Sequence, residues 1–218
     1  MLLRNMARED NKFYYKTLQE YLKRFPNSIY AAEVKNAILA LEHKQVNVNY
    51  PDVCASRDSI TVSSYVRNAN SFTIEIYRVP DNMMNEYRLD KSKLQLVSRH
   101  PVSVQGIVPF SVDKVITTLP PLPYGAYIIC PTLNDGNIAD VSRYEIMHVT
   151  DIATFSIIRN DHKDRIAAVD IKTRKPISGV TLISESGKTL GTTGTDGTIA
   201  IAYPKANNEY RRELTAVK

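Results

Sequence analysis

The sequence predicts a mainly β protein in which two antiparallel β-sandwiches follow one another and an α-helical hairpin precedes them. Three observations support this prediction. Apolar residues recur at helical spacing only between about Asp10 and Lys44. From Val46 onward, short runs alternate between apolar and polar residues and are separated by turn sequences. Thr, Val, Ile, Ser and Tyr dominate that part of the chain, which has no Trp, and such residues favour strands.

The helical region, residues 1–45, divides into two helices at Pro26. Asn27 or Ser28 is expected to cap the second helix. Residues 21–31 resemble the junction between two tetratricopeptide-like units. Because one hairpin cannot bury its own apolar face, it packs on the β domain that follows, meets further helices upstream, or does both. The apolar faces of the two helices comprise Tyr14, Leu18, Tyr21, Leu22 and Phe25, and Tyr30, Val34, Ala37, Ile38 and Leu41.

Residues 46–150 are expected to form the first sandwich. Residues 68–70 are expected to join two strands as a hairpin, and residues 134–137 make a second hairpin turn. Gly125 supplies a permissive backbone before the apolar run that follows it. Short strands separated by such turns over about a hundred residues are typical of an antiparallel sandwich. The expected strands cover residues 45–50, 59–66, 72–79, 96–104, 112–119, 124–130 and 142–149.

Residues 151–218 are expected to form a second sandwich that the chain end truncates. A turn in its middle leads to Pro176, which fixes the backbone where strand pairing resumes. Gly179 lets the chain pass close to its neighbour, and Asp196 with Gly197 provides a turn with positive φ. Each of these roles is structural rather than chemical. The expected strands cover residues 154–159, 165–170, 180–185 and 198–203.

The sequence contains no recognisable catalytic, metal or cofactor motif, so we expect neither an enzyme nor a bound cofactor. The histidines are dispersed and have no second ligand at metal-binding spacing. Residues 187–189 mimic the end of a phosphate-binding loop, but Leu182 stands where such a loop requires glycine. Cys54 and Cys130 do not form a C-x-x-C pair, which argues against zinc. They are expected to form either one disulfide or two buried thiols.

Charge and hydropathy limit the partners. The net charge of +5 comes from scattered lysines and arginines, so we expect no nucleic-acid partner. No run approaches the ~18 apolar residues of a membrane span, and we expect no direct membrane insertion by this segment. The first residues lack the apolar core of a signal peptide. Both ends suggest a piece of a longer protein.

Three motifs in the first sandwich together resemble the second macroglobulin-like (MG2) domain of bacterial alpha-2-macroglobulins. They are Ile-Tyr-Arg-Val-Pro-Asp at 76–81, Leu-Pro-Tyr-Gly-Ala-Tyr-Ile at 122–128 and Val-Thr-Asp-Ile-Ala at 149–153. Residues 169–182 and 194–197 are similar to a following macroglobulin-like domain and to carboxypeptidase-regulatory-like modules. The resemblance implies tandem immunoglobulin-like or macroglobulin-like sandwiches. The helical start suits long Bacteroidetes-type members.

The resemblance implies a structural framework for a protein that traps proteases, located in the periplasm or on the extracellular face of the cell envelope. Its implied partners are proteases, through the full-length protein, and neighbouring domains of the same chain. Neither Cys54 nor Cys130 lies in the Cys-Gly-Glu-Gln segment of thioester-bearing members, and no bait region is identifiable. The alternative is a cell-surface or outer-membrane-associated sandwich module that binds a glycan or a partner protein.

Overall fold

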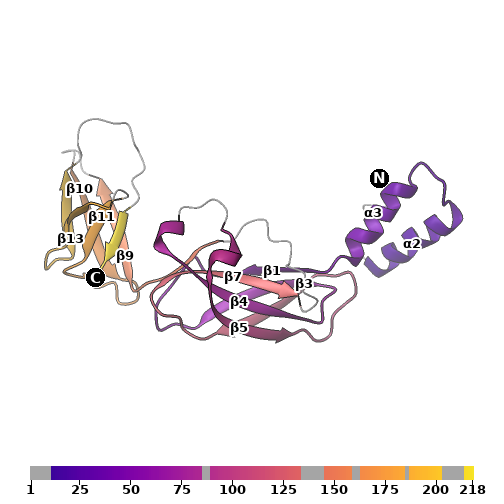
Figure 1. Ribbon diagram of the computed structural model, residues 1–218, viewed down its shortest axis with the longest axis horizontal. Coiled ribbons are helices and arrows are strands. Elements are labelled where there is room, and N and C mark those ends of the chain that lie inside the picture. Colours follow the sequence, from indigo (N-terminus) through magenta and orange to yellow (C-terminus); the bar gives the residue numbers. More distant parts are fainter. Residues whose placement is uncertain (1–10, 85–88, 134–144, 159–162, 185–186, 203–213) are drawn as a thin grey trace. The chain divides into compact units, whose positions relative to one another are not determined.

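The computed structural model describes residues 11–84, 89–133, 145–158, 163–184, 187–202 and 214–218 (Figure 1). The chain forms two compact units. The first comprises Met1–Asp52 and Asp58–His148, and the second comprises Val53–Arg57 and Val149–Lys218. The predicted mainly β architecture with two leading helices is confirmed. The expected hairpin turn at residues 134–137 falls outside the described residues.

The helical hairpin consists of α2 (Asn11–Arg24) and α3 (Ala31–Glu42). Leu18 of α2 is buried, as are Ala31 and Val34 of α3, so the two helices pack through part of their predicted apolar faces. Phe25 and Tyr30, which were expected on these faces, are instead exposed. The expected cap at Asn27 or Ser28 is wrong, because the N-cap residue of α3 is Tyr30, whose side chain forms no capping hydrogen bond. The Ser28 hydroxyl instead accepts a hydrogen bond from the Tyr30 N–H at 3.2 Å within the turn. No helix in the described part of the chain is long and apolar enough to cross a membrane.

The first sandwich pairs a three-stranded sheet of order β1-β3-β6 with a five-stranded sheet of order β2-β8-β7-β4-β5. Antiparallel pairing joins β1 with β3, β3 with β6, and β4 with both β5 and β7. The strands are β1 (Gln45–Asn49), β2 (Val53–Cys54), β3 (Ile60–Arg67), β4 (Ser71–Val79), β5 (Gln95–Ser103), β6 (Asp113–Leu119), β7 (Gly125–Leu133) and β8 (Met147–Val149). Two short 3₁₀ helices, η1 (Asp81–Met83) and η2 (Lys91–Lys93), lie between β4 and β5.

The main core lies between these two sheets. Alternate residues of β3 are buried, from Ile60 to Val66, and Phe72, Ile74 and Ile76 of β4 have no exposed surface. The expected hairpin at residues 68–70 is wrong, because β3 and β4 lie in different sheets. Each strand has one apolar face, and placing the strands in opposite sheets turns both faces toward one core.

The five-stranded sheet is also covered on its other face. Buried apolar residues of β4 and β7 form a second cluster there with Met83 and Leu94, which come from the segment between β4 and β5. Residues of β7 are therefore buried on both sides, in agreement with its continuous apolar sequence. The strand residues of this outer cluster are Tyr77, Val79, Ala126, Ile128 and Cys130.

The hairpin is attached to the first sandwich at its base. The Asn68 side chain donates to the Leu41 carbonyl at 2.6 Å and accepts from the Phe110 N–H at 2.9 Å. Phe110 stacks on Tyr15 with ring centroids 4.2 Å apart, and its carbonyl accepts from Asn11. Asn68 and Phe110 both have positive φ, of 55° and 67°, which is uncommon outside glycine. The expectation that the hairpin packs on the following β domain is met by these contacts.

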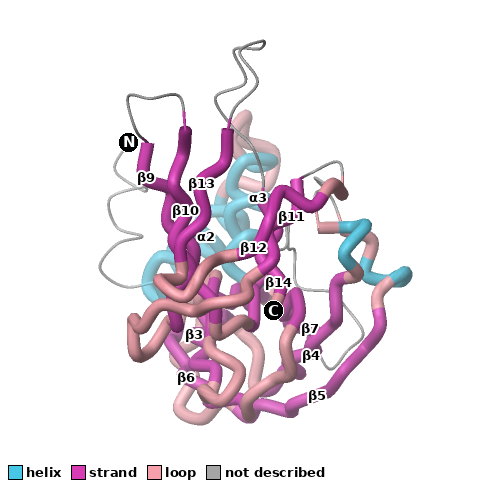
Figure 2. Tube along the Cα trace, turned by 90° about the vertical axis from the view of Figure 1, so that its left-hand side faces the viewer, coloured by secondary structure: helices cyan, strands magenta, loops and turns pink. Residues whose placement is uncertain are grey.

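The second unit contains two three-stranded sheets, of order β13-β10-β9 and β12-β11-β14. Figure 2 shows β10 between its partners β9 and β13. Residues from both sheets share one core, which includes Ile166, Val180 and Leu182. The strands are β9 (Ile152–Ile158), β10 (Lys163–Asp170), β11 (Thr181–Ser184), β12 (Thr189–Thr192), β13 (Thr198–Ala202) and β14 (Leu214–Val217).

Removing the Ser64 hydroxyl should stabilise the first unit. Ser64 is fully buried between Val48 and Val115 in the β1-β3-β6 sheet, and its hydroxyl has no hydrogen-bond partner. Because a buried hydroxyl without a partner is costly, Ser64→Ala should raise the free energy of unfolding by about 1 kcal/mol. Urea denaturation measures this, with Ser63→Ala on the opposite face of β3 as the control. A loss of stability in Ser64→Ala would contradict the prediction.

Candidate functional site

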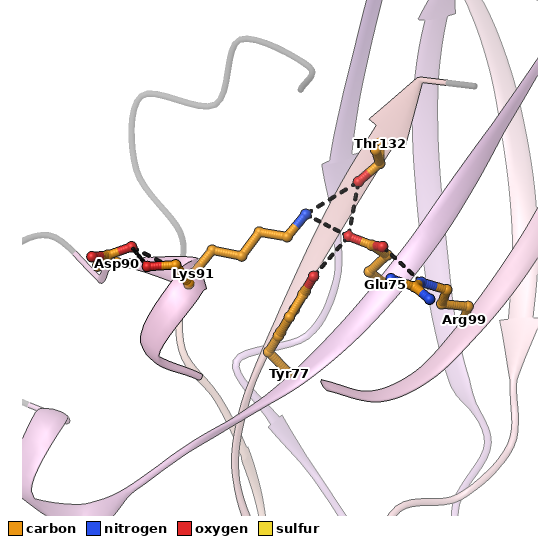
Figure 3. Close-up of polar contacts among 7 residues, drawn as sticks. Glu75, Tyr77, Asp90, Lys91, Arg99 and Thr132 are labelled. Atoms are coloured by element: carbon orange, nitrogen blue, oxygen red, sulfur yellow. Dashed lines mark hydrogen bonds and ion pairs between the residues drawn. The ribbon is translucent and has the colours of Figure 1, made fainter. Parts of the chain in front are cut away.

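The most densely bonded charged group in the described part of the chain is the carboxylate of Glu75. Glu75 lies on the outer face of β4, opposite Cys130 of β7 and Arg99 of β5. Its side chain is only 8% exposed. Figure 3 shows that side chains from β4, β5, β7 and η2 converge on it. We call Glu75, Tyr77, Lys91, Arg99 and Thr132 the Glu75 cluster.

Both carboxylate oxygens of Glu75 accept hydrogen bonds. The Arg99 Nε donates to Oε1 at 2.9 Å, and the Tyr77 hydroxyl donates to Oε2 at 2.8 Å. The Thr132 hydroxyl donates to Oε2 at 3.0 Å, and the Lys91 ammonium forms a short ion pair with the same oxygen. A carboxylate with its acceptor positions occupied in this way has little capacity to act as a base or nucleophile.

Lys91 is held in place by its own surroundings. It is the first residue of η2, and Asp90 before it accepts hydrogen bonds from the Ser92 N–H and hydroxyl at 3.0 and 2.7 Å. The Lys91 ammonium also lies 5.1 Å from the centre of the Tyr77 ring, within the range of a cation–π interaction. The segment around η2 is thus fixed to the sheet by charge as well as by the apolar contacts of Leu94.

The cluster keeps Glu75 ionised. Burial alone would raise the pKa of Glu75, but the hydrogen bonds from Lys91, Arg99, Tyr77 and Thr132 outweigh it and lower the pKa to about 2. Burial would lower the pKa of Lys91, yet its bonds to the carboxylate raise it. Burial and the bond to Glu75 together raise the pKa of Tyr77. The physical role of the cluster is therefore to bind η2 to the outer face of the sheet.

A second polar pair among the described residues has the composition of a catalytic dyad but lacks the carboxylate that would orient the histidine. The Ser98 hydroxyl lies 2.9 Å from the His100 Nε2, two residues along the same strand. In a hydrolase, the histidine would be oriented by a carboxylate. In the described part of the chain, no carboxylate accepts a hydrogen bond from His100. The described residues also contain no group of three metal-ligating side chains.

Two of the residues singled out in the second unit lie together. Pro176 forms a bridge with Val169 of β10, and the Gly197 carbonyl accepts from the Ala168 N–H at 2.8 Å. Gly197 has φ of +71°, and a Cβ there would lie 2.7 Å from the Pro176 Cβ and 2.8 Å from the Ala168 oxygen. Gly197 therefore serves both a positive-φ turn and a close approach.

The other predicted residues have separate roles. Asp196 accepts hydrogen bonds from the Thr198 N–H and hydroxyl, and these bonds lower its pKa. Gly179 has φ of +78°, but a Cβ there would meet no atom within 4 Å. Its backbone conformation, rather than the expected close approach, requires glycine. In the first unit Gly125 has φ of +149°, and a Cβ would contact the Arg78 guanidinium at 3.4 Å.

The two cysteines are buried and are not joined in a disulfide. Of the two alternatives left open by the sequence, the structure has two thiols. Cys130 belongs to the outer cluster beside Ile128 and Val79. Cys54 contributes its carbonyl, which accepts from the Thr150 N–H at 2.9 Å. Neither thiol lies in a group that could hold a metal in the described part of the chain.

The Val-Thr-Asp motif at residues 149–151 has a clear structural role within the second unit. The Asp151 carboxylate accepts from both the N–H and the hydroxyl of Ser56, each at 2.9 Å. The Thr150 hydroxyl accepts from the Ile152 N–H at 3.1 Å, where β9 begins. These bonds tie the segment Val53–Arg57 to the start of β9, which explains why that segment belongs to the second unit.

Sequence reasoning missed the Glu75 cluster. The alternation within residues 72–79 puts Glu75 on the face of β4 opposite Ile74 and Ile76, in agreement with the structure, but it does not show that this face is covered. The apolar run of β7 carried the missing signal, because a strand that is apolar on both sides needs cover on both sides. A glutamate paired with such a strand is buried, and a buried carboxylate requires partners.

Comparison with known proteins identifies the fold. No family model matches the sequence, and no curated protein sequence does. Two crystal structures of native alpha-2-macroglobulin from Escherichia coli are similar to this chain. The fragment spanning domains NIE-MG1 has a TM-score of 0.54 at 16% identity, over 80% of this chain and 93% of the fragment. The fragment spanning MG0-NIE-MG1 has a TM-score of 0.52 at 18% identity, over 80% of this chain and 64% of the fragment.

The chain has the fold of these alpha-2-macroglobulin domains. At this level of identity the likeness concerns the fold, and the chain spans less than two thirds of the longer fragment. The matched domains are named NIE and MG1, so the MG2-type identity of residues 46–150 stays a prediction.

Neutralising Glu75 should destabilise the first macroglobulin-like unit and remove one component of its acid sensitivity. Because its pKa falls from 4.5 to about 2 on folding, the ionised carboxylate stabilises the fold above pH 4.5. That stabilisation is lost as the pH falls toward 2. Glu75→Gln should lower the free energy of unfolding by about 1 to 3 kcal/mol at neutral pH. Lys91 and Arg99 retain access to water, which limits the loss.

Urea denaturation at a series of pH values checks this prediction. The difference between wild type and Glu75→Gln should shrink between pH 4.5 and 2, because other carboxylates titrate equally in both proteins. Glu33→Gln, on the exposed surface of α3, is the matched control. A difference that stays constant over this pH range would contradict the assigned role of Glu75.

Replacing Gly197 should be more harmful than replacing Gly179. Both residues have positive φ, so alanine at either position costs about 1 kcal/mol in backbone strain. At Gly197 the new Cβ also collides with Pro176 and with the Ala168 carbonyl, and the total loss should reach about 3 kcal/mol. Thermal and urea denaturation of Gly179→Ala and Gly197→Ala provide the comparison. Equal losses would show that close approach at Gly197 does not matter.

Proposed function

We propose that this chain is a framework segment of a bacterial alpha-2-macroglobulin-like protein that traps proteases. The observation that carries the proposal is the similarity of its fold to alpha-2-macroglobulin domains of Escherichia coli over 80% of the chain. In this proposal a protease cleaves the whole protein outside this segment, and the array of β-sandwiches then rearranges and encloses the protease. The segment contributes interfaces and no catalytic residue. The whole protein acts at the periplasmic or extracellular face of the cell envelope.

The contacts within the first unit suit a framework. The Glu75 cluster binds the η2 segment to the sheet, so the first sandwich has apolar cover on both faces of β4 and β7. Asn68 and Phe110 bind the helical hairpin to the same unit. Rigid domains of this kind transmit a rearrangement by moving as bodies. The partners in this proposal are proteases, through the whole protein, and the neighbouring domains of the same chain.

Incubation of the whole protein with a general protease tests the proposal. We expect cleavage followed by compaction, measured by gel filtration, and a trapped protease that digests a small peptide but not a large protein substrate. If the protein is cleaved without compaction and the protease still digests large substrates, the proposal is wrong. Binding of a glycan or partner protein without any effect on proteases would instead favour a cell-surface binding module.

A further inference from the structure

The free end of the helical hairpin exposes large apolar side chains. Ile29 is 88% exposed, Tyr30 57% and Phe25 55%, and all three lie in the short turn between α2 and α3. We call residues 25–30 the hairpin tip. Exposed apolar residues scattered singly need no explanation, but three large ones within six consecutive residues form a patch. The tip is also compact, so its exposure does not come from a frayed end.

Hydrogen bonds fix the shape of the tip. The Tyr21 hydroxyl lies 2.6 Å from the Ser28 hydroxyl, and the Ser28 N–H donates to the Phe25 carbonyl at 3.2 Å. The rings of Tyr21 and Phe25 contact each other with centroids 5.4 Å apart. The apolar side chains are therefore presented on a preformed turn, and binding through them requires little further ordering.

The tip lies at the opposite end of the hairpin from its attachment. Asn11 at the start of α2 and Leu41 near the end of α3 bind the first sandwich through Phe110 and Asn68. Helix α2 has 14 residues, so its two ends are separated by about 21 Å. The tip is thus a convex projection rather than the wall of a groove.

Positive charge lies on the α2 side of the apolar tip, whereas the first charged residue on the α3 side is Glu33. Lys23 and Arg24 directly precede it, and residues 23–32 contain no acidic residue. Lys12, Lys16 and Lys23 are exposed and lie within about 40° of one another around the axis of α2. Glu20 is the one acidic residue of this helix. A basic helix face therefore leads to an apolar end.

We propose that the hairpin tip inserts into the surface of an anionic phospholipid bilayer. Phe25 and Ile29 enter the boundary between headgroups and acyl chains, Tyr30 lies at the headgroup level, and Lys23 and Arg24 contact lipid phosphates. A protein partner would need an acidic cavity that matches this convex shape, whereas a fluid bilayer adapts to it. Each basic side chain near an anionic surface strengthens binding about fivefold.

This proposal revises the expectation that the segment does not insert into a membrane directly. That expectation rested on the lack of an apolar run long enough to span the bilayer, which the described helices also lack. Insertion of a tip at the interface needs only a few side chains and no span. The proposal is independent of protease trapping, because variants at the tip should leave cleavage and compaction unchanged.

The absence of tryptophan from the chain provides a direct test. Phe25→Trp places a single indole at the tip. With vesicles of phosphatidylglycerol and phosphatidylethanolamine, its emission should shift to shorter wavelength and be quenched by lipids brominated on their acyl chains. With vesicles of phosphatidylcholine alone, the emission should remain that of an indole in water. An emission that anionic vesicles leave unchanged would overturn the proposal.

Cosedimentation with the same anionic vesicles separates the contribution of the apolar side chains to binding from that of the basic side chains. Phe25→Ser combined with Ile29→Ser should weaken binding at least about tenfold, and Ile29→Ser alone should weaken it less. Lys23→Gln combined with Arg24→Gln should weaken it about 25-fold at low salt. Leu39→Ser, a residue of α3 that is 62% exposed but lies outside the tip, is the control and should bind as wild type. If Leu39→Ser loses as much binding as the tip variants, the assignment to the tip is wrong. Circular dichroism confirms that each variant is folded.

Discussion

Burial of the Glu75 carboxylate on the outer face of β4 is the constraint around which the first unit is arranged. A carboxylate that is 8% exposed must be paired, and its donors come from three elements besides its own strand. Arg99 is on β5, Thr132 on β7 and Lys91 on η2. Satisfying one charge therefore fixes the positions of two neighbouring strands and of the segment that covers them. The apolar cluster of Tyr77, Cys130 and Leu94 is enclosed by the same arrangement.

The strand positions and the fold class could be predicted because alternation of apolar and polar residues directly reflects a half-buried sheet. β3 and β4 occupy almost the residues expected for them. Their pairing could not be predicted in the same way. Alternation shows which residues share a face, but it does not show whether two successive strands pair or face each other across a core. At residues 68–70 the chain crosses between sheets, and the side chain of Asn68 is used to bind the helices.

The Glu75 cluster could not be predicted either, because it depends on contacts between residues that are distant in sequence. Lys91 and Glu75 are sixteen positions apart and come together only because η2 folds over the sheet. In the second unit, by contrast, Pro176, Asp196 and Gly197 could be singled out, because turns depend on local backbone requirements. Even in the second unit, turn chemistry alone did not give the full reason for each glycine. The clash at Gly197 involves Ala168, which is distant in sequence, whereas Gly179 has open space around it.

The cluster defines a geometry more than it adds stability. Desolvating a carboxylate and an ammonium offsets most of their attraction, and apolar residues of similar size often stabilise a fold as well. Apolar contacts such as those of Met83 and Leu94 are non-directional, so they do not by themselves fix the position of the η2 segment along the sheet. Hydrogen bonds to a single carboxylate permit one register only. Lys91 therefore determines where the segment lies, and the apolar residues supply most of the free energy that keeps it there.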